Sequence, residues 1–263
     1  MANSINVNVG AMVALQNLNA TNKALEVTQN RVNTGLKVAT AKDNGAIFAI
    51  ATNQRAEMGA LDAVKQSIQR GQSIVDVALA AGDTVVAALT EMKALAVAIE
   101  ANGDPTSAAY AALQGDFDAF KTEIASSLSG ATFDGVNLWD ADDVVSVKVN
   151  TAESDSSFNI GFAGGWTPLD LDDMTTAGVD AAIKAFTAGL ATLGTQSKSL
   201  DRQHTFTAKL QDAVEVGIGN LVDADLAKES ARLTALQTKQ QLGVQALSIA
   251  NSSSQILLSL FRS

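Results

Sequence analysis

The sequence contains no cysteine, one histidine and two prolines, and aromatic residues make up only 5% of it. Without cysteine there is no disulfide, no thiolate nucleophile and no thiolate metal ligand. The single histidine, His204, lacks the partner ligands that a transition-metal site needs, so we interpret it as a polar residue at a helix contact. No phosphate-binding glycine loop or histidine–carboxylate–nucleophile set is present, and we expect neither enzymatic activity nor a cofactor.

The scarcity of proline and aromatic residues, together with abundant alanine, favours long helices that pack through small side chains. The length of 263 residues suits one large or two modest domains. A formal net charge of −10 argues against a nucleic-acid partner, because binding to phosphates needs a basic surface.

Charge is absent from both ends of the chain. The first 22 residues and residues 240–261 contain no charged side chain. Six asparagines interrupt the first of these segments, and because a membrane span needs ~20 mainly apolar residues, we expect no membrane insertion. The N-terminus also lacks the basic and apolar regions of a secretory signal, so we expect no cleaved signal peptide. The shared lack of charge indicates that the two ends belong together.

The last helix, predicted within residues 220–261, has an unusually broad apolar face. Three rows follow heptad spacing, and they comprise Leu226, Leu233 and Leu247, then Leu236, Ala250 and Leu257, and then Leu242, Ile249 and Ile256. Three rows are more than a two-stranded coiled coil buries. We therefore expect this helix to contact several partners.

A matching helix is predicted over residues 5–36. Its apolar row contains Leu18, Leu25 and Val32, and Met12 and Leu15 precede that row by one or two turns. Asn22 and Gln29 flank the row, where a polar residue usually fixes the register of a helix pair at some cost in stability.

The longest periodic stretch predicts a helix over residues 46–100, capped by Asp43 or Asn44. Two heptad rows, which begin at Ile47 and Ile50, are apolar at twelve of sixteen positions. Gly71 and Gly82 lie on these rows, and we interpret them as sites of close packing.

Two further helices are predicted on either side of an acidic segment. The first begins with Asp104 as its cap and Pro105 at its first position, and it ends at Gly130. The second begins near Gly178 and continues towards the terminal helix through residues 222–225. Its apolar row begins with Phe186, Leu193 and Leu200.

The acidic segment, residues 131–180, holds ten acidic residues and one basic residue, a net charge of −9. Alternation over residues 144–149 and 158–162 predicts a β-hairpin. The clusters around Asp142–Asp143 and Asp172–Asp173 resemble calcium ligands in composition, but neither has the spacing of an EF-hand loop. We expect a solvated acidic lobe that keeps an outer surface soluble.

These elements predict a mainly α fold of long antiparallel coiled-coil helices from both chain ends, with a small central β-hairpin lobe. The first helix pairs with the last, and the long second helix pairs with the fourth. The expected domains are an inner terminal coiled coil (1–40 and 222–263), a helical rod (41–130 and 178–221) and an acidic hairpin outer lobe (131–177).

Both chain ends resemble bacterial flagellins. The likeness rests on the stretches ANSINVNVGAMVALQNL, RVNTGLKVATAKDNGAIFAI and NLVDADLAKESARLTALQTKQQLGVQALSIANSSSQILLSLF, and it is greatest to the short flagellins of stalked alphaproteobacteria. The resemblance covers roughly the first 100 and the last 85 residues. It implies terminal helices that form an inner coiled coil, and a central segment that faces outward.

The resemblance also implies the function and the partners. The chain would be exported through the flagellar apparatus to the extracellular filament with the help of an export chaperone. It would assemble with other copies of itself and other flagellins, and it would meet the filament cap and hook-junction proteins. The expected self-assembly interface comprises Leu15, Leu18, Leu25, Val32, Leu226, Leu233, Leu236, Leu242, Leu247, Ile249, Ile256 and Leu257.

Two alternatives stand beside the filament subunit. A hook–filament junction protein has similar termini but forms a short ring, and the stretch DADLAKESARLTALQTKQQ favours a flagellin over it. A helical enzyme or soluble binding module would need a pocket around the acidic pairs Asp142–Asp143 and Asp172–Asp173, and the sequence indicates none.

Overall fold

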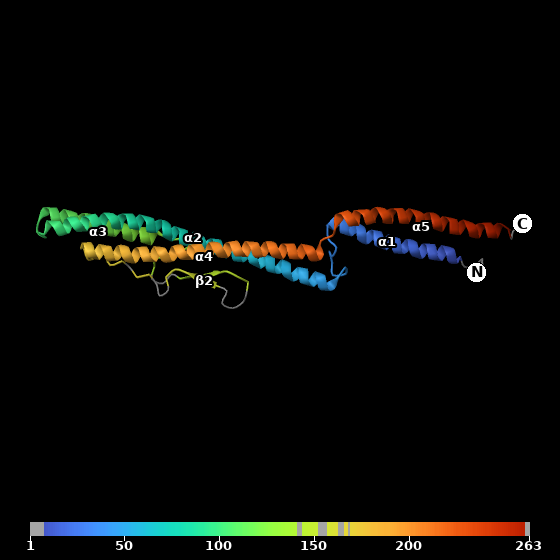
Figure 1. The fold of residues 1–263 in the computed structure, drawn as a ribbon, viewed down its shortest axis with the longest axis horizontal. Coiled ribbons are helices and arrows are strands. Elements are labelled where there is room, and N and C mark those ends of the chain that lie inside the picture. The colour runs from blue at the N-terminus through green and yellow to red at the C-terminus, as the bar shows by residue number, and fades with distance from the viewer. Residues whose placement is uncertain (1–7, 141–143, 152–156, 163–165, 168, 261–263) are drawn as a thin grey trace. The chain divides into compact units, whose positions relative to one another are not determined.

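The computed structural model describes residues 8–140, 144–151, 157–162, 166–167 and 169–260. This part of the chain forms five helices and one two-stranded antiparallel sheet (Figure 1). In chain order they are α1 (Val9–Thr34), α2 (Gly45–Asn102), α3 (Ala108–Gly130), β1 (Val145–Lys148), β2 (Ser157–Ile160), α4 (Thr176–Val222) and α5 (Leu226–Leu260). The predicted mainly α fold with a small hairpin is therefore confirmed.

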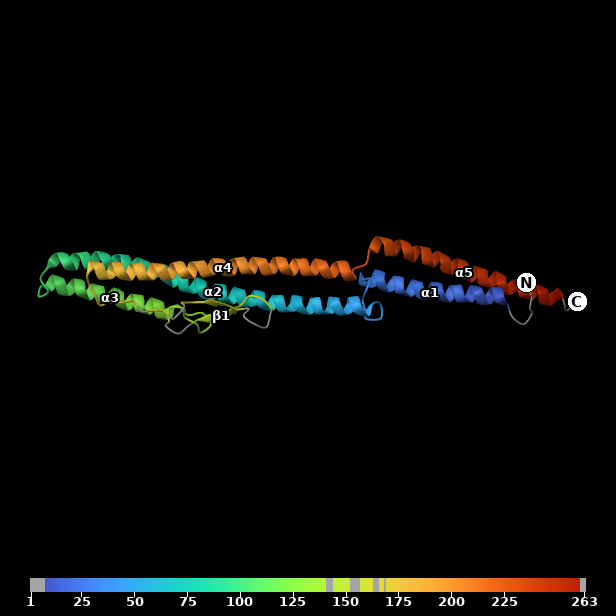
Figure 2. The ribbon, with the colours of Figure 1, turned by 60° about the horizontal axis from the view of Figure 1, so that its bottom comes forward.

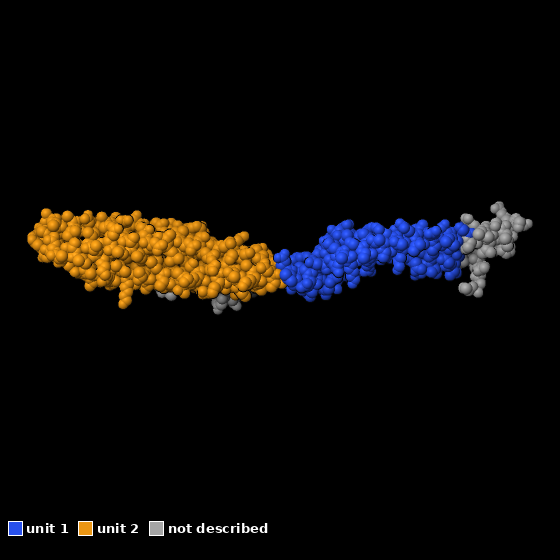
Figure 3. All heavy atoms as spheres, turned by 45° about the horizontal axis from the view of Figure 1, so that its top comes forward, with its two compact units in different colours: residues 1–56, 214–263 blue, residues 57–213 orange. Residues whose placement is uncertain are grey.

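The chain divides into two compact units, shown in different colours in Figure 3. Unit 1 contains residues 1–56 and 214–263, and unit 2 contains residues 57–213. The acidic hairpin segment falls within unit 2. The three-domain division expected from the sequence stays a prediction.

The core of unit 2 is built on the two heptad rows of α2. From Leu61 to Ile99 nearly every position of both rows is buried, and Ile68, Val75 and Leu89 are completely inaccessible to solvent. The rows are less well covered at the beginning of α2, where Ile50 is 49% exposed. In a single copy, the apolar face predicted for the whole helix is therefore a core only from Leu61 onward.

Helix α4 packs antiparallel to α2 in unit 2. A Cβ atom at Gly71 would lie 3.5 Å from Leu200 Cδ1, and one at Gly82 would overlap Leu190 Cδ2. The predicted close packing at both glycines is thus confirmed. The Nε2 atoms of His204 and Gln69 are 3.3 Å apart, so His204 is a polar residue at a helix contact, as expected.

The hairpin segment contributes apolar side chains to the same core. β1 and β2 are paired so that Val145 faces Ile160 and Lys148 faces Ser157, and β1 lies beside α2 in Figure 2. Ser67 of α2 accepts a hydrogen bond from the Lys148 backbone at 3.0 Å. The Gln196 side chain of α4 both accepts from the Gly161 amide (2.9 Å) and donates to its carbonyl oxygen (2.7 Å).

Aromatic residues fix the loops around the hairpin to the helices. The Trp139 ring stacks on Phe186 with centroids 4.6 Å apart, and Trp166 meets Trp139 edge-on at 4.8 Å. The indole N–H of Trp139 donates to the Ala78 carbonyl oxygen at 2.9 Å. The acidic side chains of this segment that the structure describes are exposed, whereas Leu138, Trp139, Val147 and Ile160 are buried, so its acidity is confined to the surface.

Helix α2 is long and apolar enough to span a membrane by length and composition alone. In unit 2 its apolar rows are covered by α3, α4 and the hairpin segment.

The predicted cap of α3 was wrong. The helix begins at Ala108, and the Ser107 hydroxyl caps it by accepting from the Tyr110 backbone at 3.1 Å. Asp104 instead accepts from the backbone and hydroxyl of Thr106, which lower the pKa of its carboxyl. Pro105 then occupies a turn closed by a hydrogen bond from the Ser107 amide to the Asp104 carbonyl oxygen.

Of the two caps expected for α2, the structure selects Asn44, whose side chain accepts from the Ile47 backbone at 3.2 Å. Asp43 closes the preceding turn. It accepts from the backbone and hydroxyl of Thr40 and from the backbone of Ala39, and these hydrogen bonds lower its pKa.

We expect Gly71→Ala to destabilise unit 2. The new methyl group would meet Val147 Cγ2 at 2.6 Å, and overpacking costs ~1–3 kcal/mol against a helix-propensity gain of ~1 kcal/mol. Gly59→Ala is the control, since nothing lies within 4 Å of its Cβ position. Urea unfolding followed by tryptophan fluorescence measures both, because Trp139 and Trp166 lie in this core. A Gly71→Ala protein as stable as Gly59→Ala would contradict the packing argument.

We expect Ser107→Ala to lower the free energy of unfolding of unit 2 by about 1 kcal/mol, the usual value of an N-cap. Ser107→Asp keeps an acceptor for the Tyr110 amide and should retain most of the stability. The same urea titration distinguishes them. Equal losses in both variants would show that the hydroxyl does not act as a cap.

Candidate assembly surface

Helices α1 and α5 of unit 1 lie side by side and antiparallel (Figures 1 and 2). Most half-buried and buried positions of each helix recur with heptad spacing, and these positions define the seam between the two helices. On α1 they are Ala11, Ala14, Leu18, Thr21, Leu25, Thr28 and Val32, and on α5 they are Glu229, Leu233, Leu236, Gln240, Gly243, Leu247 and Ala250. The seam is rich in small residues, so the two backbones approach closely. A Cβ atom at Gly243 would lie only 3.2 Å from Leu18 Cδ1.

Polar contacts set the register of this seam along its whole length. The Asn8 side chain caps α1 by accepting from the Ala11 backbone at 3.0 Å, and its amide donates to the Ala250 carbonyl oxygen at 2.8 Å. In the middle of the seam, the Gln240 amide donates to Asn22 Oδ1 at 2.9 Å. The role predicted for Asn22 in fixing the register is supported by this contact.

The ion pair between Arg31 and Glu229 joins the other end of the seam. Arg31 Nη1 lies 3.2 Å from Glu229 Oε1, and the Glu229 side chain is only 11% exposed. Arg31 Nε and Glu229 Oε2 are buried without a hydrogen-bond partner within the described chain. The Arg31 side chain is 27% exposed, so the pair is only partly buried, but removing Arg31 would leave the Glu229 carboxylate largely buried without its cation. This pair therefore strongly disfavours other registers.

Next to this ion pair, the segment after α1 pairs with residues 222–224 through backbone hydrogen bonds. The sequence had predicted that the helical pattern continues through residues 222–225. Gly35 ends α1 with a φ of +71°, and Leu36 then pairs with Asp223 as an isolated antiparallel bridge. The Ala224 amide donates to the Gly35 carbonyl oxygen at 2.8 Å, and the Lys37 amide donates to the Val222 carbonyl oxygen at 2.6 Å. These bonds hold residues 223–225 out of a helix. The stretch from residue 220 onward is thus split between α4 and α5.

The seam leaves large apolar side chains uncovered on both helices. On α5, Leu226 is 50%, Leu242 59% and Ile249 65% exposed, and on α1, Met12 is 62% and Leu15 48% exposed. Because a seam buries only the positions that face the partner helix, the remaining apolar rows point to solvent in a single copy.

The twelve residues expected to form the assembly interface thus fall into three groups. Six lie in the α1–α5 seam, namely Leu18, Leu25, Val32, Leu233, Leu236 and Leu247. Four are exposed and available to other copies, namely Leu15, Leu226, Leu242 and Ile249. Ile256 and Leu257 belong to α5, but their side chains lie outside the described part of the structure.

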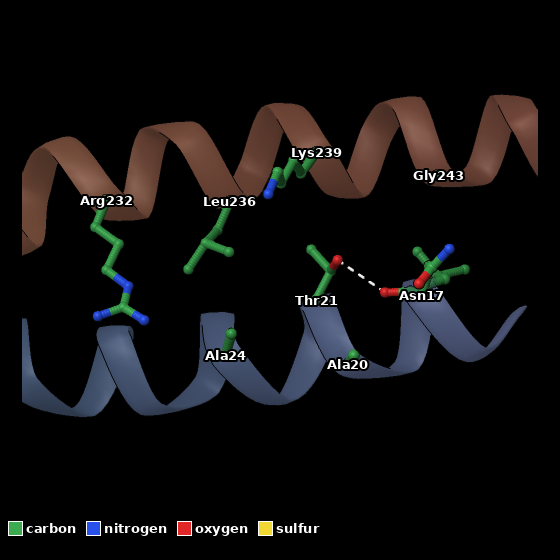
Figure 4. Close-up of a pocket in the computed structure, with 9 residues that line it drawn as sticks. Asn17, Ala20, Thr21, Ala24, Arg232, Leu236, Lys239 and Gly243 are labelled. Carbon is green, nitrogen blue, oxygen red and sulfur yellow. Dashed lines mark hydrogen bonds between the residues drawn. The ribbon is translucent and has the colours of Figure 1, made fainter. Parts of the chain in front are cut away.

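A groove of about 530 Å³ follows one flank of the seam. It is lined by Asn17, Leu18, Ala20, Thr21 and Ala24 from α1 and by Arg232, Leu236, Lys239 and Gly243 from α5. Figure 4 shows Arg232 and Leu236 extending from α5 towards α1. The Thr21 hydroxyl is turned back to the Asn17 carbonyl oxygen at 2.8 Å, the bond drawn in Figure 4.

The sequence interpretation missed the polar and small members of the seam. Thr21 and Thr28 lie three residues after Leu18 and Leu25, and Gly243 lies seven residues after Leu236, so extending the leucine rows by three or seven residues would have found them. Arg31 and Glu229 carried no such signal, because their partnership joins residues 198 positions apart.

Metal-binding clusters of three or more histidine or acidic side chains do not occur among the residues that the structure describes. Asp172 lies 2.6 Å from Lys121 Nζ, and this hydrogen bond lowers the pKa of the Asp172 carboxyl. Asp142 and Asp143 lie outside the described residues.

Comparison with known proteins agrees with this arrangement of two terminal helical regions. Residues 5–143 match the bacterial flagellin N-terminal helical region, and residues 176–261 match the bacterial flagellin C-terminal helical region. Flagellin FljM of Caulobacter vibrioides is 50% identical over 273 residues, which cover 99% of each chain. A flagellin of Brucella melitensis is 38% identical and covers 98% of this chain and 99% of its own.

A crystal structure of Bacillus cereus flagellin aligns with 54% of this chain and 88% of its own, with a TM-score of 0.45 and 19% identity. The sequence matches are much stronger, and they confirm the resemblance seen at both chain ends. This chain belongs to the bacterial flagellin family.

Proposed function

We propose that this protein is a structural, non-enzymatic subunit that self-assembles into the extracellular flagellar filament and so supports swimming motility. The observation that carries the proposal is the apolar surface that α1 and α5 leave exposed after pairing with each other. Leu242 and Ile249 are more than half exposed although they follow the heptad pattern of a buried row. Family membership supports the same function.

Assembly proceeds by covering these rows with α1 and α5 of other copies. An antiparallel pair of helices with one narrow seam is only marginally stable in water. The terminal helices therefore become ordered when neighbouring copies bury their outer apolar rows. Each exposed apolar side chain that becomes buried contributes ~1.5–3 kcal/mol. The surfaces that meet differ between the two copies, and a heterologous contact that does not close on itself grows as an open helical polymer.

The proposal extends to the partners of the filament. The subunit copolymerises with other flagellins, and it meets a hook-junction protein at the base and a cap at the tip. It is exported through the flagellar apparatus and is carried there by an export chaperone that covers α5. The long exposed apolar rows of α5 support the need for such a cover before assembly.

The proposal predicts that purified monomer extends fragments of its own filament into long filaments. Fragments prepared by sonication would seed fresh monomer, and electron microscopy would measure length against time. The heterologous apolar surfaces predict open growth without a fixed final length. Discs or short rings would instead support a hook–filament junction protein, and a monomer that never adds to seeds would rule out both functions.

We expect the double substitution Leu242→Ser and Ile249→Ser to block polymerisation without changing the fold of unit 2. Losing two apolar contacts of ~1.5–3 kcal/mol each raises the critical monomer concentration at least ~100-fold. Sedimentation of filaments from monomer at several concentrations measures this value.

The matched control is Leu242→Ile with Ile249→Leu, which keeps the volume and hydrophobicity of both positions. It should polymerise almost as the unchanged protein does. If the serine variant has the same critical concentration as this control, the outer rows do not form the assembly surface.

A further inference from the structure

The groove beside the α1–α5 seam carries positive charge with no acidic group among its described lining residues. Arg232 and Lys239 line it together with the polar side chains of Asn17 and Thr21. Neither cation forms an ion pair or a hydrogen bond within the described part of the chain. Small residues at Ala20, Ala24 and Gly243 leave the groove open to an incoming side chain.

The exposed charge of α5 is entirely basic. Its four charged residues are Lys228, Glu229, Arg232 and Lys239, and the single acid, Glu229, is buried against Arg31. Lys228, Arg232 and Lys239 follow one another at spacings of four and seven residues, so they share one side of the helix. This basic side borders the groove. Leu242, one of the exposed apolar residues, follows Lys239 by three positions on the same side.

Charge is also divided between the two units. Unit 1 has nine basic and six acidic residues, a net charge of +3, whereas unit 2 has nine basic and twenty-two acidic residues, a net charge of −13. Three acids of unit 1 are exposed and make no hydrogen bond or ion pair through their side chains in the described structure, namely Glu26, Glu215 and Asp223. Unit 1 therefore presents both free cations and free carboxylates.

Glu26 illustrates why a carboxylate of the same chain does not fill the groove. Leu25 lies in the seam, and successive residues of an α-helix are turned by about 100°. Ala24 is turned to the side that lines the groove, so Glu26 is turned to the opposite flank of α1. A group on that flank faces away from its own groove and is free to contact another copy.

We propose that this groove binds a carboxylate of a second copy of the chain, held between Arg232 and Lys239. The inference rests on the proposed self-assembly and adds a directional ionic contact to its apolar surface. The cations lie on one flank of the α1–α5 pair and the carboxylates lie elsewhere on unit 1, so the contact joins unlike surfaces. Such a heterologous contact favours one order of neighbours, and opposite charges fix register and suppress wrong pairings.

The first test reverses the charge of the groove with Arg232→Glu and Lys239→Glu. The critical monomer concentration should rise at least ~10-fold, because the second copy's carboxylate then meets like charge. The control is Lys23→Glu with Lys42→Glu, which makes the same change in net charge at exposed sites of unit 1 outside the groove. The variant Arg232→Gln with Lys239→Gln removes the attraction without adding repulsion. Its critical monomer concentration should lie between those of the charge-reversed groove variant and the Lys23 and Lys42 control.

Far-UV circular dichroism and tryptophan fluorescence of each monomer establish that unit 2 is folded. A groove variant that polymerises like the Lys23 and Lys42 control overturns the inference and leaves the proposed function intact. Failure of the unchanged protein to extend seeds would instead remove the proposed function itself.

The second test uses the absence of native cysteine. Chains with Lys239→Cys are copolymerised with chains carrying Glu26→Cys, Glu215→Cys or Asp223→Cys, and the filaments are mildly oxidised. A disulfide-linked dimer of one chain of each type in any of the three mixtures supports the contact and identifies the acid. Dimers in none of the three mixtures would overturn it. The exposed residue Thr238, changed to Cys in place of Lys239, gives the background level of cross-linking.

Discussion

The geometry of a two-helix seam is the constraint on which this protein depends. Helices α1 and α5 can bury only the positions that face each other, and those positions are mainly leucine together with the small residues alanine, threonine and glycine. Leu242 and Ile249 belong to a row that no second helix of the same pair can cover. In unit 2, by contrast, α2 is surrounded by α3, α4 and the hairpin segment, and its rows are buried. The same heptad pattern therefore yields a closed core in one unit and an open surface in the other.

Specificity in the seam comes from its polar contacts rather than its apolar ones. The pairs Asn8–Ala250, Asn22–Gln240 and Arg31–Glu229 have residue numbers that add to nearly the same value, which is the signature of one antiparallel register. Apolar side chains tolerate a shift of one heptad, whereas a shifted Arg31 would leave Glu229 buried without a cation. The seam gives up some stability to these polar groups and gains a unique alignment. A unique alignment matters because it fixes where the outer rows stand relative to each other.

Periodicity made the helices, their pairing and the hairpin predictable from the sequence. The rows through Ile68, Val75 and Phe186 follow directly from the apolar spacing, because burial on one side is what creates that spacing. The prediction of the N-cap of α3 failed because two neighbouring residues compete for that position. Asp104 and Ser107 are both good caps, and the turn around Pro105 decided between them.

Contacts between distant parts of the chain could not be read from local sequence. The break after Val222 exists because Gly35, nearly two hundred residues earlier, accepts a hydrogen bond from Ala224. The same holds for the Arg31–Glu229 pair. Within the candidate surface, the leucines were therefore predictable from their spacing. Their division between seam and outer rows required the structure, since it depends on which side of each helix its partner occupies.

The unequal charges of the two units bear on how copies can associate. A net charge of −13 on each unit 2 opposes close contact between copies, although salt reduces this repulsion beyond a distance of ~8 Å at physiological ionic strength. Unit 1, at +3 and with uncharged ends, carries little of this penalty. In the proposed assembly, attraction between copies would therefore be concentrated in the terminal helices, and the acidic residues of unit 2 would oppose association through the remaining surface. An assembly driven from its ends in this way orders the terminal helices and joins the copies in a single step.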